Sequence, residues 1–227
     1  MRVDGVRGFV QRRGTAVTSP SAAAQATVSS ETVSTSGTEA STSAVVERFS
    51  TSKFQVPLDV DTPSWLRGPP TIDGATYLTW ASPDESPAVR FLVPTTLIQP
   101  HATEVTAAPD DYLEYLHGLV PAGVILEDEE NITIGGLPAT IVTVTSSNDL
   151  EGALGCVGLD VGNDCLGYPT DLRLRMAVLK VGDKTLLIWG RSDRDSPEIT
   201  DNDKSLESML ASVEFRDAAI LSSEPTS

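Results

Sequence analysis

The feature that most constrains the fold is the segment "LRLRMAVLKV-GD-KTLLIWG", residues 172–190. Two runs of residues that favour β-structure flank Gly182 and Asp183, a two-residue turn that suits a type II′ hairpin. From Met176 onward both faces of the hairpin are apolar, and the return strand contains the apolar run "LLIW". A strand that is apolar on both faces belongs in a sheet that is covered on both sides. The hairpin therefore predicts the buried middle layer of a compact domain.

The rest of the chain supplies further strands and two helices. The segment "APDDYLEYLHGL" predicts a short helix, because Pro109 suits the first turn of a helix and Gly118 can end it. A second helix is expected at about 201–213, where apolar residues recur at helical spacing. Further strands are expected at "KFQVPLDV" (53–60), "ATYLTW" (75–80), "AVRFLV" (88–93), "NITI" (131–134), "ATIVTVT" (139–145) and "VEF" (213–215).

These elements predict an α+β fold. Hairpin connections make the sheet mostly antiparallel, and helices are expected to cover both of its faces. We expect one such domain at residues 50–216. Residues 1–49 are expected to be a disordered tether, basic at first and then rich in Ser, Thr and Ala, because this composition buries too little apolar surface to offset the cost of ordering it. Residues 217–227 are expected to be a disordered tail.

The charge and hydropathy of the chain exclude some partners. Acidic residues outnumber basic ones by 32 to 16, which gives a formal net charge of −16. Nucleic-acid binding needs clustered Lys and Arg side chains, so no nucleic-acid partner is expected. No run approaches the roughly 20 apolar residues of a membrane span, so none is expected. The first residues are basic, but the apolar core of a signal peptide does not follow them, which leaves the true start of the protein open.

The two cysteines, Cys156 and Cys165, allow several interpretations. A structural zinc site needs four ligands, typically in closely spaced pairs, which these positions do not offer. A nucleophilic cysteine needs a base and an electropositive setting, whereas the nearby charged residues are aspartates. A disulfide fits best, because glycines between the cysteines let the chain turn back and because disulfides persist in oxidising compartments. Two free thiols in a reduced cytosol remain the alternative.

No catalytic, cofactor-binding or metal-binding residue is assigned from the sequence. A serine hydrolase needs a nucleophile, a histidine and an acid, and the G-x-S-x-G motif does not occur. His117 is explained by its place in the last turn of the first helix, and His101 by a polar loop. The acidic run Glu127–Glu130 is expected to be a solvated loop. The acidic segment 193–203 lacks the glycine and glutamate that an EF-hand loop needs at fixed positions.

Two residues are candidates for ligand binding, Trp65 and Arg67, in the proline-flanked loop "TPSWLRGPP". An exposed Trp beside an Arg is typical of an anchor in a binding interface. The alternative is that Trp65 packs the loop onto the core. Trp80 and Trp189 lie in predicted strands and are expected in the core.

Four segments, in this order, resemble an uncharacterised group of actinobacterial extracytoplasmic proteins: "FQVPLDVDTPSWL", "APDDYLEYLHGL", "ITIGGLPATIVTV" and "MAVLKVGDKTLLIWG". Those proteins are anchored by a membrane helix or a lipid and are similar to the Mog1/PsbP-like α/β/α sandwich. The resemblance covers about residues 54–215 and implies a non-enzymatic binding or accessory domain, with no functional residues to transfer. This chain differs from the group at its front, where the expected anchor is absent.

The sequence therefore predicts a monomeric, non-enzymatic binding or sensory accessory domain, held outside the cytoplasmic membrane on a flexible tether. Its expected partner is a protein or a component of the cell envelope. Three alternatives stay open: a hydrolase with an unrecognised active site, a structural accessory of a membrane complex, and a cytoplasmic location.

Overall fold

The structure of this chain is a computed structural model that describes residues 47–51, 53–63, 66, 68–81, 88–158 and 164–216. The expected tether before residue 47, the candidate residues Trp65 and Arg67, and the expected tail at 217–227 lie outside these ranges. The first strand begins at Glu47, before the domain boundary expected at residue 50. Within the described ranges, no helix is long and apolar enough to cross a membrane.

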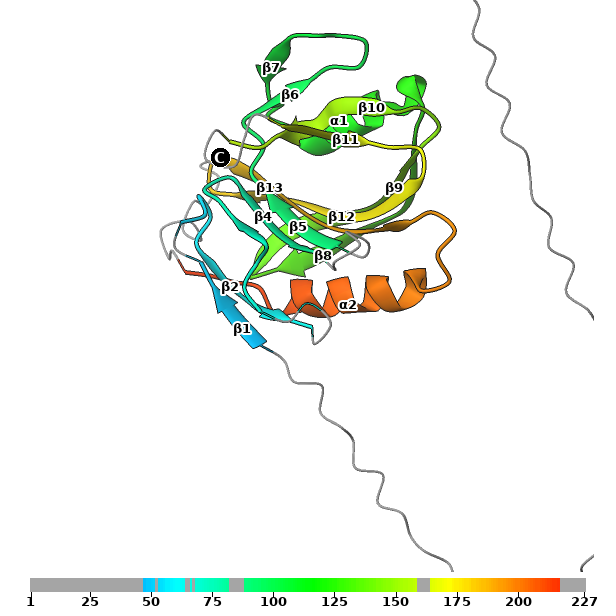
Figure 1. Ribbon diagram of the computed structural model, residues 1–227. Helices are drawn as coiled ribbons and strands as arrows, with labels where there is room; N and C mark the ends of the chain where they lie inside the picture. The colour runs from blue at the N-terminus through cyan, green and yellow to red at the C-terminus, as the bar shows by residue number, and fades with distance from the viewer. Residues whose placement is uncertain are drawn as a thin grey trace, which may run out of the picture. The chain divides into compact units, whose positions relative to one another are not determined.

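Within the described residues, seven strands form an antiparallel sheet at the centre of the domain (Figure 1). In spatial order they are β3 (Ile72–Asp73), β4 (Tyr77–Ala81), β5 (Ala88–Leu92), β13 (Lys184–Asp193), β12 (Leu172–Val181), β9 (Leu137–Ser146) and β8 (Val124–Ile134). The predicted hairpin is β12–β13, in the middle of the sheet. Leu179 and Leu187 are only 3% and 0% exposed, which confirms that both faces of the hairpin are buried. Gly182 has a φ of 63°, which suits the first central position of a type II′ turn.

One face of the sheet packs against α2 (Ile199–Ala211) and a small sheet formed by β1 (Glu47–Ser50), β2 (Leu58–Thr62) and β14 (Glu214–Phe215). The apolar side chains of α2 that were predicted from helical spacing, Leu206, Met209 and Leu210, are all buried in this core. The contact is close, because a Cβ added to Gly190 of β13 would lie 3.3 Å from the Leu206 side chain. Figure 1 shows α2 running along this face of the sheet.

The opposite face of the sheet is covered differently. The covering elements are β6 (Thr96–Ile98), β7 (Val105–Ala107), α1 (Tyr112–Gly118), a 3-10 turn (Val120–Ala122), β10 (Leu150–Cys156) and β11 (Cys165–Tyr168). The paired strands β10 and β11 lie over the sheet, and the seven-residue helix α1 packs beside β10 through Tyr112 and Leu116 (Figure 1). The expectation that helices cover both faces is therefore not supported: α2 covers one face, whereas a strand pair forms much of the other layer.

Two local predictions were wrong for identifiable reasons. The acidic run Glu127–Glu130 is part of β8 and not a loop. Because β8 is an edge strand, one side of it faces solvent, where charged side chains are tolerated and discourage pairing with other chains. The ladder to β9 is interrupted within this run, and Asp128 has a φ of 50°. The strand predicted at 53–60 begins only at Leu58, directly after Pro57, although Phe54 and Val56 before it are buried.

Candidate functional site

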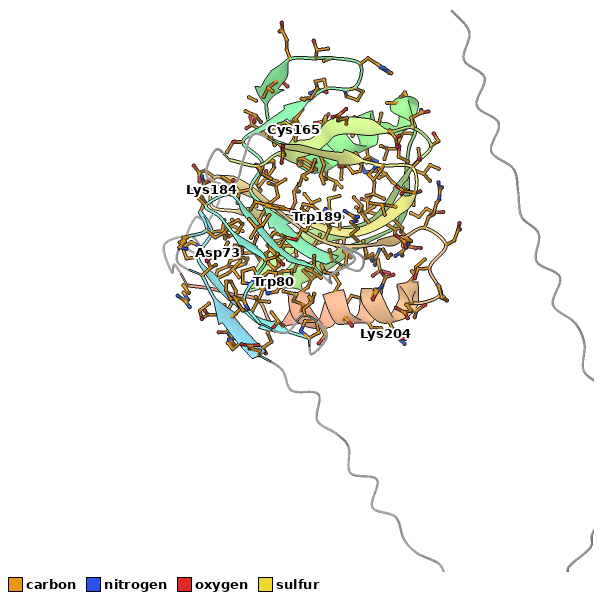
Figure 2. The ribbon with its side chains drawn as sticks, viewed as in Figure 1. Asp73, Trp80, Cys165, Lys184, Trp189 and Lys204 are labelled. Carbon is orange, nitrogen blue, oxygen red and sulfur yellow. A yellow bond between two sulfur atoms is a disulfide. The ribbon has the colours of Figure 1, made fainter. Side chains whose placement is uncertain are left out.

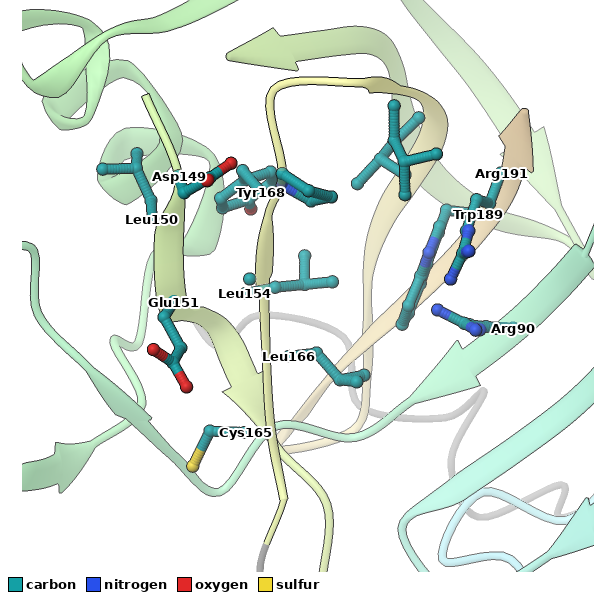
Figure 3. Close-up of a pocket in the computed structure, with 14 residues that line it drawn as sticks. Arg90, Asp149, Leu150, Glu151, Leu154, Cys165, Leu166, Tyr168, Trp189 and Arg191 are labelled. Carbon is teal, nitrogen blue, oxygen red and sulfur yellow. The ribbon is translucent and has the colours of Figure 1, made fainter. Parts of the chain in front are cut away.

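The most distinctive cavity is a pocket of about 390 Å³ between the β10–β11 pair and the central sheet. We call it the arginine pocket, because Arg90 and Arg191 reach it from the sheet. Figure 3 shows both guanidinium groups beside the Trp189 ring, with β10 and β11 on the opposite side. The other lining residues are Asp149, Leu150, Glu151, Leu154, Cys165, Leu166, Gly167, Tyr168, Pro169, Leu172 and Leu174.

The register of the central strands explains why the two arginines meet. Trp189 of β13 is paired with Arg90 of β5, and Arg191 lies two residues further along β13, paired with Ala88. Residues two apart on one strand share a face, and diagonal neighbours on adjacent strands are within reach of long side chains. Arg90, Trp189 and Arg191 therefore form one group on the face that β10 and β11 cover. Ile188, directly before Trp189 in sequence, points to the α2 core.

Both arginines are only half exposed to solvent. The Nε atoms of Arg90 and Arg191 are buried. For Nε of Arg191, the described part of the chain offers no hydrogen-bond acceptor. The hydroxyl of Thr79, which is paired with Arg90 across β4 and β5, is likewise buried without a partner among the described residues. Unpaired buried polar groups cost free energy, so these two atoms are unsatisfied groups beneath this end of the pocket, of which only Arg191 belongs to a residue that lines it.

The β10–β11 pair forms the roof of the pocket, and a disulfide joins its two strands. Cys156 and Cys165 are opposite each other in the β10–β11 register and are bonded, as the sequence predicted. Cys165 also lines the pocket, and Figure 3 shows it on the same strand as Leu166 and Tyr168. The β10–β11 pairing is irregular between Leu150 and Gly155. The disulfide therefore fixes two short strands whose own ladder is incomplete.

Two buried tyrosines attach the roof to α1. The hydroxyl of Tyr112 donates to the Leu154 carbonyl at 2.6 Å and lies 3.3 Å from the hydroxyl of Tyr168. Burial raises the pKa of both hydroxyls well above the usual value for tyrosine. They therefore stay protonated at neutral pH and serve as hydrogen-bonding groups. Tyr115 donates to the Ala153 carbonyl at 2.8 Å in the same way.

The acidic residues of the pocket lie at its rim. Asp149 and Glu151 are exposed, at the start of β10. Asp149 has a structural role, because its carboxylate accepts a hydrogen bond of 2.9 Å from the Thr170 backbone N–H. Figure 3 shows both acids on the β10 side, across the pocket from the two arginines. The pocket is thus polarised, with negative charge at the exposed edge and positive charge on the sheet.

A second pocket, of about 520 Å³, lies between the start of α1 and the ends of β9, β12 and β13. Its walls include Leu113, Pro138 and Val178, and its cation, Lys180, is exposed. An exposed lysine keeps most of its hydration and interacts only weakly with a ligand. The half-buried arginines make the arginine pocket the stronger candidate.

The sequence predicted the disulfide but not the site that it supports. Trp189 was expected only as a core residue; it is 0% exposed, and it also forms part of the pocket wall. Figure 2 places it on the same side of the sheet as Cys165, with Trp80 on the side of α2. The available signal was an arginine within the apolar strand "AVRFLV" and another directly after "LLIWG". His101 and His117 are both exposed, and His117 pairs with Glu129 at 3.1 Å.

No protein-family model matches this chain, and no curated protein sequence matches it. Among solved structures, the chain is similar to cyanobacterial PsbP from Synechocystis sp. PCC 6803, with 11% identity and a TM-score of 0.42 over 76% of this chain and 93% of that one. It is similar to the Ran-binding protein Mog1p of Saccharomyces cerevisiae, with 10% identity and a TM-score of 0.42 over 78% and 99%.

A structure from Bacteroides thetaiotaomicron is also similar, with 10% identity and a TM-score of 0.39 over 76% of this chain. This chain spans about half the length of that protein, 49%. Two of these three structures, PsbP and Mog1p, are the proteins after which the Mog1/PsbP-like fold is named. No residue role, ligand or partner is carried from any of them to this chain.

Proposed function

We propose that this domain is a non-enzymatic binding module that takes a small ligand in the arginine pocket. The observation that carries the proposal is the half-buried pair Arg90 and Arg191 beside Trp189, under a roof fixed by a disulfide. Ligand sites in proteins are typically concave and apolar, with a few polar groups that orient the ligand. The arginine pocket has this composition, and its volume of about 390 Å³ is within the usual range of ligand sites.

The side chains of the pocket favour binding over chemistry. A guanidinium keeps its charge and donates hydrogen bonds, but it does not exchange protons near neutral pH. Cys165 is oxidised in the disulfide and is not a nucleophile in that state. The raised pKa of Tyr168 disfavours the tyrosinate that a base or a nucleophile would need. These properties support a binding role, with the ligand held and not converted.

The disulfide also supports a location outside the cytoplasm, because structural disulfides persist in oxidising compartments. An accessory role towards a protein or a component of the cell envelope, and a flexible tether before residue 47, are part of the same proposal. Trp65 and Arg67 remain candidates for contact with such a partner. The high net negative charge of the whole chain, −16, favours its solubility.

Ligand-observed NMR with a fragment library tests the proposal. The library contains anions, cations and neutral molecules, and the full chain is compared with Leu166→Trp, which fills the pocket from its half-buried wall. The matched control is Leu126→Trp, a half-buried leucine on β8 outside the pocket. We expect fragments that bind the wild type and the control but not Leu166→Trp. Fragments that bind all three proteins equally, or an absence of binding to the wild type, would contradict the proposal.

A further inference from the structure

We propose that a second cavity, the α1 groove, binds short apolar peptides that have free termini. The α1 groove is the pocket of about 520 Å³ between the segment that leads into α1 and the strands β8, β9, β12 and β13. It shares no lining residue with the arginine pocket. The proposal therefore goes beyond the proposed function and does not depend on it.

The floor of the α1 groove is apolar and open to solvent. Thr140 of β9 is paired with Asn131 of β8 and with Val178 of β12, so these three side chains form a row on one face of the sheet. Val178 and Leu113 are half-buried and Pro138 is exposed, so each of them presents surface to a ligand. An apolar body that covers this floor is stabilised in proportion to the area that it removes from water.

Two charges of opposite sign border the floor. Asp110 precedes α1 and Lys180 is on β12, and both are exposed residues that line the groove. Neither side chain forms an ion pair or a hydrogen bond with a described residue. A ligand with an ammonium group beside Asp110 and a carboxylate beside Lys180 would complement both charges. A ligand with only one charge would complement one of them and meet the other with the same sign.

A hydroxyl group beside Lys180 is a second observation that indicates a ligand. Thr185 of β13 is paired with Lys180, lines the groove and is only 8% exposed. Its hydroxyl forms no hydrogen bond with a described residue, and it is not among the buried atoms that are closed to solvent. A polar group in this position costs free energy when it has no partner. A carboxylate beside Lys180 would accept its hydrogen bond.

The position of the two charges favours a peptide over a free amino acid. In an amino acid the ammonium and the carboxylate are attached to one carbon, whereas Asp110 and Lys180 belong to different elements that border the floor. The termini of a short peptide are farther apart, because each extended residue adds up to about 3.5 Å. Its apolar side chains can cover the floor between them. The volume of about 520 Å³ is within the usual range of ligand sites.

Four forms of one dipeptide, leucylphenylalanine, test the proposal on the full chain. The forms are the free dipeptide, the N-acetylated dipeptide, the C-amidated dipeptide and the dipeptide with both ends blocked. Titrations followed by ¹H–¹⁵N NMR give the Kd of each form for the wild type, for Asp110→Asn and for Lys180→Met. Asp195→Asn and Lys204→Met are the controls, because both residues are exposed and lie outside the groove. Asn131→Trp fills the groove from an exposed position on the edge strand.

We expect the free dipeptide to bind about two- to fivefold more tightly than either singly blocked form, because exposed charge pairs contribute modestly. Asp110→Asn should remove the effect of acetylation and Lys180→Met the effect of amidation, whereas the controls should keep both effects. Thr185→Val should weaken only the forms with a free carboxylate, and Asn131→Trp should weaken all four.

Equal Kd values for the four forms, or effects of blocking that persist in Asp110→Asn and Lys180→Met, would overturn the assignment of the ligand class. Binding that Asn131→Trp does not weaken, or no binding to the wild type, would overturn the α1 groove as a binding site. The proposed function is tested separately, because Leu166→Trp fills only the arginine pocket.

Discussion

Reduction of the Cys156–Cys165 disulfide should destabilise the domain by a calculable amount. The two cysteines are nine positions apart in the sequence, so the bond closes a short loop in the unfolded chain. In the loop-entropy model, closing a loop of this length stabilises the folded state by about 2–3 kcal/mol. We expect reduction to lower the unfolding free energy by this whole amount, because both strands of the roof pack on the core of the sheet through residues such as Leu154 and Tyr168.

Urea denaturation, followed by far-UV circular dichroism with and without a reductant, measures this loss. With a typical slope of about 2 kcal/mol per molar urea, the midpoint should fall by about 1–1.5 M on reduction. The double variant Cys156→Ala/Cys165→Ala is the control and should have the same midpoint with and without reductant. If reduction shifts the wild-type midpoint by less than about 0.3 M, the roof is stable without the bond, and the structural role given to the disulfide is wrong.

Three further perturbations have defined outcomes. Tyr112 and Tyr168 have a raised pKa in the folded state, so their contribution to the unfolding free energy is complete below pH 10. Above pH 10 this contribution is lost, by about 1.4 kcal/mol per pH unit for each tyrosine. Urea midpoints should therefore fall from pH 9 to 11, and they should fall less steeply in Tyr168→Phe. Arg175→Met should lower the unfolding free energy by about 1–3 kcal/mol in the same assay, because this side chain is buried and donates to a β8 carbonyl at 2.8 Å; no change would contradict that role. Gly152→Ala should lower the melting temperature, because the φ of Gly152 is 76° and a Cβ there would lie 2.7 Å from a β6 side chain. Gly118→Ala is the control and should leave the melting temperature unchanged, because no atom lies within 4 Å of its added Cβ.

The sequence predicted the centre of the fold better than its periphery. The hairpin β12–β13 was predictable because β-propensity, turn chemistry and apolar pattern all agree over residues 172–190. The layer above the sheet was not. The segment 150–168 contains several glycines and two cysteines and shows no alternation of apolar and polar residues. The sequence therefore contains no pattern that predicts strands β10 and β11. Tertiary packing and the disulfide, not local propensity, hold these strands in place.

The candidate site depends on register, which a single sequence does not reveal. Arg90 and Arg191 are about a hundred positions apart and meet only because β5 pairs with β13. In the sequence, Arg90 interrupts an apolar strand, and Arg191 follows another; each alone is compatible with an exposed strand end. The cysteines, by contrast, are close in sequence and few in number, so their pairing could be predicted from spacing and elimination.

The most direct test of the arginine pocket is the indole N–H signal of Trp189 in a ¹H–¹⁵N NMR spectrum, assigned with Trp189→Phe. On titration with 1-anilinonaphthalene-8-sulfonate, this signal should shift with saturation, whereas that of Trp80, on the α2 side of the sheet, should stay in place. A saturating shift of Trp65 or Trp80 with Trp189 unchanged would place the ligand elsewhere and would contradict the account given for this pocket.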